Sequence, residues 1–293
     1  MNGFLIVDKP SGVTSFSMVS LVRRLTGVRR VGHAGTLDPL ASGVLPVAVG
    51  YATRFIEYMD DALKTYVAAV RFGEATDTYD AAGAVTARGD ASGVTAAAVE
   101  SALREYVGEI VQTPPVFSAI KVAGKPLYRY AREGADVTVA ARTVFVESAT
   151  LRGYAGGAAE IEVRCGKGTY IRSIAHDLGQ RLGCGAHLSA LRRTSSGGLS
   201  LADAFTPGAL TQLAGEGRMA EAMLAPDRAV ERRPAAILAD EHSVDVACGR
   251  DLTFAPARAV DLCRAYSAEG DFLGVLRRRS GERWHPEKVV GRG

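Results

Sequence analysis

The chain has 293 residues, 47% of them hydrophobic and 23% charged, so it can form a packed core and is not expected to be disordered. We expect neither a signal peptide nor a membrane segment, because the first residues are not basic and no apolar run approaches roughly 18 residues. The net charge is only +3, but residues 1–40 hold five Lys and Arg against two Asp and Glu, and residues 161–200 hold six against two, which indicates a surface that faces a polyanion.

The first element predicted is a strand over residues 3–10, where the apolar run GFLIVDKP ends at a proline. A helix should follow, capped by Thr14 or Ser15 and ended by Gly27. A strand is predicted next at residues 43–50, followed by a short helix at residues 51–59. Residues 64–73 alternate in polarity and read as a strand, and residues 94–108 read as a capped helix.

Residues 117–134 are irregular, with a strand-like start, a turn at AGKP and a short helix. Residues 143–155 and 158–166 read as a hairpin around GYAGG. The strongest helix prediction covers residues 169–183, with Thr169 as a possible cap and one apolar face made of Ile171, Ile174, Ala175, Leu178 and Leu182.

The chain becomes helical and polar after about residue 198, and short strands and turns follow from residue 232. Strands and helices do not alternate regularly, which favours an α+β fold with a mixed, mostly antiparallel sheet and flanking helices. We therefore predict a main domain over residues 1–231 and a small β-rich domain over residues 232–293.

Several common catalytic motifs are absent. CGKGTY lacks the first glycine and the Ser or Thr of a phosphate loop, and it also fails the dinucleotide pattern. The five histidines show no HExxH spacing, no GxSxG elbow is present, and the four cysteines form no CxxC pair. We expect no metal and free thiols.

Asp38 is the one acidic residue in the stretch VGHAGTLDPLASGVLPVAVG, residues 31–50. An Asp before a proline is typical of an ordinary turn. However, the nearby glycines permit close backbone approach and apolar residues follow directly, so a carboxylate here would need a partner. Arg172 in GTYIRS is a candidate partner, because it falls off the apolar face of its helix, although a solvated surface arginine is the common alternative.

Taken in order, the blocks GFLIVDKPSGVTS, VGHAGTLDPLASGVL, KTY, GTYIRSIAHDLG and LRRTSSG resemble the bacterial tRNA pseudouridine synthase B (TruB) family. The resemblance is close over roughly residues 3–200, and Ala34 is a small departure from the threonine of many members. It implies a pseudouridine synthase fold, with a C-terminal RNA-binding domain of PUA type at residues 232–293. The implied activity is that of an isomerase forming pseudouridine at position 55 in the tRNA T-arm.

The resemblance also implies roles for single residues. Asp38 would act on a flipped-out uridine, by attack at C1′ or C6 or through a glycal, and Arg172 would pair with it. Tyr66 would stack on the uracil and help with the proton lost from C5. The remaining implied contacts with the flipped nucleotide are His33, Tyr170 and Leu191, and Lys9 would support the catalytic loop.

A second set of residues is implied to contact RNA: Lys121, Lys125, Arg129 and Arg132 in an insertion at about residues 117–142, and Arg192 and Arg193 as phosphate contacts. A solvated helix face is the alternative for the first four. The isomerisation needs no redox partner, metal or energy source, so we expect no cofactor. We expect a cytoplasmic monomer whose partner is tRNA. The competing hypothesis is an RNA-binding, tRNA-folding protein whose role does not need catalysis.

Overall fold

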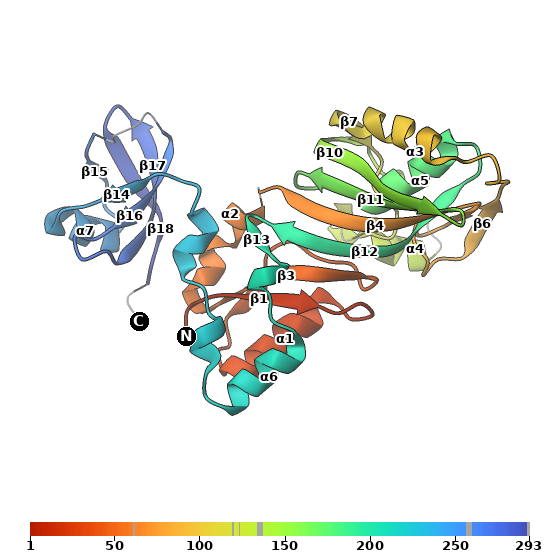
Figure 1. Ribbon diagram of the computed structural model, residues 1–293. Coiled ribbons are helices and arrows are strands. Elements are labelled where there is room, and N and C mark those ends of the chain that lie inside the picture. The colour runs from red at the N-terminus through yellow and green to blue at the C-terminus, as the bar shows by residue number, and fades with distance from the viewer. Residues whose placement is uncertain (61, 119, 123, 134–136, 256–259, 292–293) are drawn as a thin grey trace.

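A computed structural model describes residues 1–60, 62–118, 120–122, 124–133, 137–255 and 260–291. Figure 1 shows a large curved sheet with helices packed on it, and a separate small β-rich unit formed by the C-terminal residues. The predicted α+β class is therefore confirmed. No helix among the described residues is long and apolar enough to span a membrane.

The large sheet is mixed and mostly antiparallel. Its main path runs β1 (Gly3–Lys9), β3 (Ala41–Val49), β12 (Ala186–Ser196), β4 (Lys64–Phe72), β11 (Ala158–Cys165), β10 (Arg142–Ala155) and β7 (Gly108–Gln112), with β2 (Val31–His33) on β3 and β13 (Leu199–Ser200) on β12. Pairing along this path is antiparallel except between β12 and β3. Both faces of β1 are covered, with Leu5 in one apolar cluster and Phe4 in another, which explains its unbroken apolar run.

The helices pack on this sheet at two places (Figure 1). α1 (Ser15–Thr26) and α6 (Pro207–Gly215) lie near β1, whereas α3 (Ala96–Leu103) and α5 (Ile171–Arg181) pack together against β10 and β12. The remaining short helices of this part are η1 (Gly50–Phe55), α2 (Ile56–Asp60), η2 (Arg104–Tyr106), η3 (Leu201–Asp203), η4 (Met219–Ala222) and η5 (Pro226–Val230).

The caps of two helices test the sequence predictions directly. Thr14 caps α1 by accepting a hydrogen bond from the Ser17 N–H at 3.1 Å, and Gly27 ends the helix with φ +68°, as predicted. The predicted Thr169 cap of α5 is wrong. Tyr170 takes the N-cap position without a side-chain cap, and its backbone N–H donates to Gln112 Oε1 at 2.7 Å instead.

β12 is a central strand that the sequence patterns did not identify. It pairs with β3 on one side and β4 on the other, so that Arg193 lies beside both Gly43 and Tyr66. Leu191 is likewise flanked by neighbours from β3 and β4. The strand therefore joins the N-terminal strands β1, β2 and β3 to the rest of the sheet and supplies one wall of the site described below.

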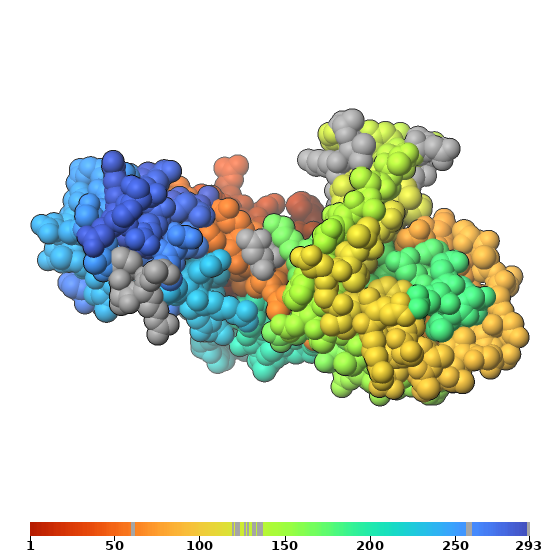
Figure 2. Space-filling model, turned by 90° about the horizontal axis from the view of Figure 1, so that it is seen from above, coloured from red at the N-terminus to blue at the C-terminus, as the bar shows by residue number. Residues whose placement is uncertain are grey.

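Two smaller ladders extend from the large sheet. β5 (Glu74–Thr76) pairs with β6 (Val85–Arg88), and β8 (Lys121–Val122) pairs with β9 (Lys125–Pro126), which leads into α4 (Leu127–Arg132). In Figure 2 the yellow-green segment that includes α4 projects from the body of the molecule.

The C-terminal residues form a five-stranded sheet in the order β14 (Ala235–Ile237), β16 (Leu262–Tyr266), β17 (Phe272–Ser280), β18 (Arg283–Val289) and β15 (Leu252–Thr253), with α7 (Asp240–Ala247) packed on it. Trp284 is fully buried in its core. Leu262 and Val275 instead join an apolar cluster with Phe55, so this unit is packed against the short helices η1 and η5 of the main part.

Candidate active site

The loop between β2 and β3 carries Asp38 and is tied down from several sides. The Ser15 hydroxyl donates to the Leu37 carbonyl and accepts from the Leu37 N–H, both at 2.9 Å. The fully buried Lys9 donates through Nζ to the carbonyls of Val13 at 2.7 Å and Pro39 at 3.4 Å. These bonds keep the backbone on either side of Asp38 in one position.

Asp38 and Arg172 form an ion pair at the mouth of a pocket. Arg172 Nε lies 3.0 Å from Asp38 Oδ2, although one residue comes from the loop before β3 and the other from the first turn of α5. Arg172 is buried, at 4% exposure, whereas 39% of the Asp38 side chain is exposed. The carboxylate is thus accessible to a substrate while its counter-ion is not.

A second carboxylate, Asp80, was not found by the sequence reasoning. Its Oδ2 lies 3.7 Å from Arg172 Nη1, and the same guanidinium donates to the carbonyls of Thr78 at 3.1 Å and Phe117 at 3.0 Å. The only signal available was a glycine-bounded acidic segment, GEATDTYDAAG, which is equally typical of a solvated loop. Arg172 is therefore held by two carboxylates and two carbonyls.

The turn that presents Asp80 has an unusual backbone. Tyr79 is the one non-glycine residue with positive φ, at +64°, within the described part of the chain. Its ring stacks on His176 of α5, with centroids 3.8 Å apart and planes 15° apart. Tyr79 is next to Asp80 in the chain, and His176 is one helical turn after Arg172. The stacked rings therefore help to fix the positions of both Asp80 and Arg172.

The surroundings of Asp38 alter its ionisation. Burial raises the pKa of Asp38 above its ordinary value, and the Arg172 guanidinium opposes that rise while Asp80 adds to it. A carboxylate that is partly removed from water is a stronger nucleophile than a fully hydrated one. Arg172 favours the charged form in this position.

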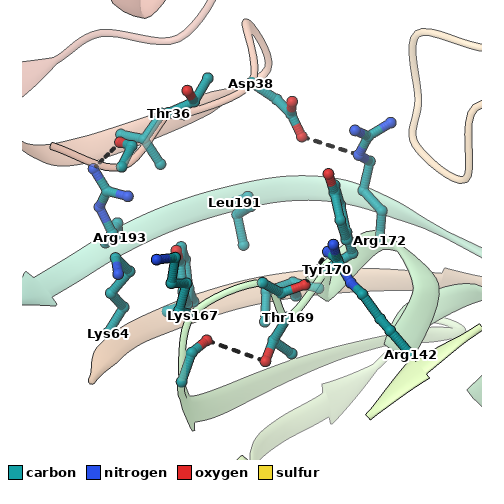
Figure 3. A pocket seen from close by; sticks show the side chains of 16 residues that line it. Thr36, Asp38, Lys64, Arg142, Lys167, Thr169, Tyr170, Arg172, Leu191 and Arg193 are labelled. Carbon is teal, nitrogen blue, oxygen red and sulfur yellow. Dashed lines mark hydrogen bonds and ion pairs between the residues drawn. The ribbon is translucent and has the colours of Figure 1, made fainter. Parts of the chain in front are cut away.

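The pocket beside Asp38 has a volume of about 270 Å³, near the small end of the range for small-molecule sites. Six of the predicted residues line it: Asp38, Tyr66, Tyr170, Arg172, Leu191 and Arg193. Figure 3 shows the Asp38–Arg172 pair at one end of the pocket and Arg193 at the other, with Leu191 between them. The pocket wall thus combines one reactive carboxylate with aromatic and aliphatic surface.

Tyr66 and Tyr170 differ in their environments. Burial raises the pKa of the Tyr66 phenol, while the nearby Arg193 guanidinium lowers it. The phenol is therefore protonated at neutral pH. The ring of Tyr170 is flanked by two cations, with the guanidinium carbons of Arg142 and Arg172 5.0 Å and 5.9 Å from its centroid. Arg142, which the sequence reasoning missed, also donates to the Gly168 carbonyl.

The other predicted contacts lie in different places. His33 is in β2, opposite Val47 of β3, and does not line the pocket. Arg192 is half-exposed and donates to Asp8 Oδ2 at 2.9 Å. Lys125 is paired with Glu133, and Arg129 is exposed on α4. The side chains of Lys121 and Arg132 lie outside the described part of the structure.

The expectation that Arg193 contacts an RNA phosphate is wrong. The side chain is fully buried, with Nε donating to the Val44 carbonyl at 2.7 Å and Nη2 to the Gly35 carbonyl at 3.0 Å. Alternation along β12 points it inward, whereas its neighbour Arg192 points outward. Arg193 therefore belongs to the pocket and not to the outer surface.

Among the described residues, no group of three or more His, Cys, Asp or Glu side chains is placed to hold a metal ion. The four cysteines are free, and Cys248 is the exposed one. The chemistry that the pocket offers is that of a carboxylate, phenols, and guanidinium and ammonium groups.

Comparisons with known proteins identify the family of the chain. Residues 23–171 match the N-terminal domain of TruB family pseudouridylate synthases, and residues 172–230 match the C-terminal domain of tRNA pseudouridylate synthase B. A tRNA pseudouridine synthase B from Dehalococcoides mccartyi is 41% identical over 99% of this chain and 96% of its own length. A tRNA pseudouridine synthase B from Azoarcus is 43% identical over 99% of this chain and 95% of its own length.

Solved structures give the same result for the fold. The chain in a Cbf5–Nop10–Gar1 complex superposes with a TM-score of 0.76 at 28% identity, over 99% of this chain and 85% of that one. A chain of an H/ACA ribonucleoprotein bound to a substrate RNA containing 2′-deoxyuridine superposes with a TM-score of 0.75 at 26% identity, over 98% of this chain and 84% of that one. On these matches and on its site, the chain belongs to the TruB family of pseudouridylate synthases and is an isomerase.

Proposed function

We propose that this protein converts uridine 55 in the T-arm of tRNA to pseudouridine, with Asp38 acting directly on a flipped-out uridine. The observation that carries the proposal is the 3.0 Å pair between Asp38 and a buried Arg172 at the mouth of a pocket lined by Tyr66 and Leu191. Relatives of nearly the same length are named as tRNA-modifying enzymes, which supports tRNA as the substrate.

The reaction detaches uracil from C1′ at N1 and rejoins it through C5. A carboxylate can attack C1′ or C6, or assist a glycal route, and the geometry of Asp38 suits all three. The proton on C5 is lost and N1 gains one, so atoms balance without an oxidant or an energy source. Tyr66 is proposed to stack on the uracil and to help with the proton lost from C5, while its raised pKa keeps the phenol neutral.

The base of a paired or stacked nucleotide must leave its stack to reach a pocket of this kind. Tyr66, Tyr170 and Leu191 offer the aromatic and aliphatic surface that a flipped base needs. Lys125 and Arg129 on the projecting segment, together with Arg192, are proposed to contact the RNA backbone. His33 is proposed to contact the displaced nucleotide from outside the pocket, and Lys9 to support the loop that carries Asp38.

We propose residues 1–231 as the catalytic domain, with an RNA-gripping insertion at about residues 117–142, and residues 232–293 as an RNA-binding domain of PUA type. The second matched region ends at residue 230 and β14 begins at Ala235, which supports this boundary. The proposal also includes action in the cytoplasm as a monomer, which gel filtration would test for the oligomeric state.

The experiment is to incubate the purified protein, without cofactor, with tRNA and with an isolated T-arm hairpin, and to map pseudouridine in both. We expect modification of uridine 55 alone. Asp38→Asn should abolish product while RNA affinity stays within about tenfold, or roughly 1.4 kcal/mol. Full turnover by Asp38→Asn would refute the mechanism, and product at another position would refute the assigned site.

A further inference from the structure

Arg193 is a buried arginine in the pocket wall whose known contacts leave one nitrogen unused. Two of its nitrogens donate to the carbonyls of Val44 and Gly35. The third, Nη1, is also buried and has no acceptor in hydrogen-bond geometry among the described residues, while the guanidinium lies close enough to the Tyr66 phenol to lower its pKa. A buried donor without an acceptor costs free energy, so such groups in enzyme sites often await a ligand.

The positive charge of Arg193 is not required for its structural bonds, because a neutral amide could also donate to backbone carbonyls. Among the described residues it forms no ion pair with a carboxylate, and its charge contributes to the lowered pKa of the buried Lys9. A permanently charged guanidinium beside another buried cation is unfavourable for stability. A role in the reaction would explain why it is kept there.

The sheet register places Arg193 at the pocket. It lies opposite Tyr66 on β4 and beside Gly43 on β3. Gly43 has φ +103°, and a Cβ atom there would come within 2.2 Å of the Arg193 carbonyl oxygen, so this strand pair is packed as closely as glycine permits. The guanidinium consequently has a fixed position, across the pocket from Asp38 (Figure 3).

The proposed reaction needs a cation at such a place. Uracil is neutral before reaction, but breaking the C1′–N1 bond leaves the electron pair on the ring, spread over N1, O2 and O4. Attack at C6 instead places negative charge on O4 through the C5–C4 enolate. Either route develops charge on a carbonyl oxygen, and a fixed donor that meets this charge stabilises the transition state more than the ground state.

We propose that Arg193 is a further catalytic residue, whose Nη1 donates to a carbonyl oxygen of the flipped uracil and stabilises the ring while it is anionic. This inference rests on the proposed function. Arg193 keeps its proton throughout. The electron pair that moves onto the ring returns when C5 forms its bond to C1′, and the C5 proton then leaves.

The first test compares Arg193→Gln and Arg193→Lys under single turnover at saturating T-arm hairpin. Arg193→Gln should react about a hundredfold more slowly, as when one donor to a developing oxyanion is removed. RNA affinity should stay within about threefold, and Arg193→Lys should recover part of the rate. Arg88→Gln, which removes an exposed arginine on β6, is the matched control. A rate for Arg193→Gln within threefold of wild type would overturn the proposal.

The second test does not depend on the stability of one variant. Hairpins are synthesised with sulfur in place of O2 or O4 of the target uridine, because sulfur is a weak acceptor. Sulfur at one of these two positions should slow the reaction of the wild type and of Arg193→Lys. It should slow Arg193→Gln much less, because that variant has already lost the hydrogen bond to the uracil oxygen. Equal slowing of all three proteins by both substitutions would overturn the role of Arg193. Conversion of the unmodified hairpin by the wild type tests the proposed function separately.

Discussion

Replacing Arg172 by methionine tests the arrangement around Asp38 most directly. At 3.0 Å, two unit charges attract by about 5 kcal/mol at the effective dielectric constant of about 20 that suits protein sites. Because 39% of the Asp38 side chain is exposed, solvent screening reduces this value, and we take about 3 kcal/mol. Lost from the ionised form of Asp38, this free energy reduces the charged, reactive fraction of the carboxyl, and with it the rate, by up to roughly a hundredfold.

The same substitution should change the pH dependence. Burial raises the pKa of Asp38 and Arg172 opposes the rise. In the wild type the rate should therefore fall as the pH is lowered through that raised pKa, since the protonated carboxyl is not a nucleophile. Without Arg172 the pKa rises further, so the acid limb of the profile should move to higher pH.

The assay is single-turnover pseudouridine formation on the T-arm hairpin between pH 5 and 9, together with RNA affinity and thermal unfolding. Arg181→Met, an exposed arginine in the same helix that pairs with Glu105, is the matched control. A stability loss of about 3–5 kcal/mol is expected, because two carboxylates lose their shared cation. If Arg172→Met keeps the acid limb of the pH profile at the wild-type position and reacts within threefold of the wild-type rate, the proposed role of Arg172 is refuted.

Three further predictions follow from the same region. Asp80→Asn should lower the rate about tenfold with little change in RNA affinity, because Asp80 helps to orient Arg172; an unchanged rate constant would contradict this. Gly43→Ala should destabilise the fold by at least about 2 kcal/mol in denaturant unfolding, given the 2.2 Å approach of a Cβ to the Arg193 oxygen and the positive φ, whereas Gly215→Ala, in open space, should be nearly neutral. The pKa of Lys9 falls from 10.5 to about 8 through burial, so unfolding takes up a proton between these values. The free energy of unfolding of the wild type should therefore rise relative to that of Lys9→Met from pH 8 towards pH 10.5, and a constant difference would refute the assignment.

The prediction of local elements succeeded where the signal lies within a few residues. The helix capped by Thr14 and ended by Gly27 is present, and the alternation at residues 64–73 matches β4, which places Tyr66 on the buried face. The Thr169 cap failed because the Thr169 hydroxyl donates to the Gly166 carbonyl at 3.2 Å, and the N-cap is the next residue, Tyr170, whose N–H donates to Gln112 of β7. Contacts outside the helix therefore decided at which residue it begins.

Sequence patterns by themselves determined the α+β class, most helices and strands, and Asp38 as a carboxylate that needs a partner, because apolar periodicity, caps and a lone carboxylate are local properties; the reactive role of Asp38 came from the family resemblance. Only the tertiary structure decided that Asp80 shares Arg172 with Asp38, and that Arg193 is buried while Arg192 is half-exposed. The physical reason is that strand order and register bring distant residues into contact. One residue of difference along β12 turns a side chain from the solvent into the pocket.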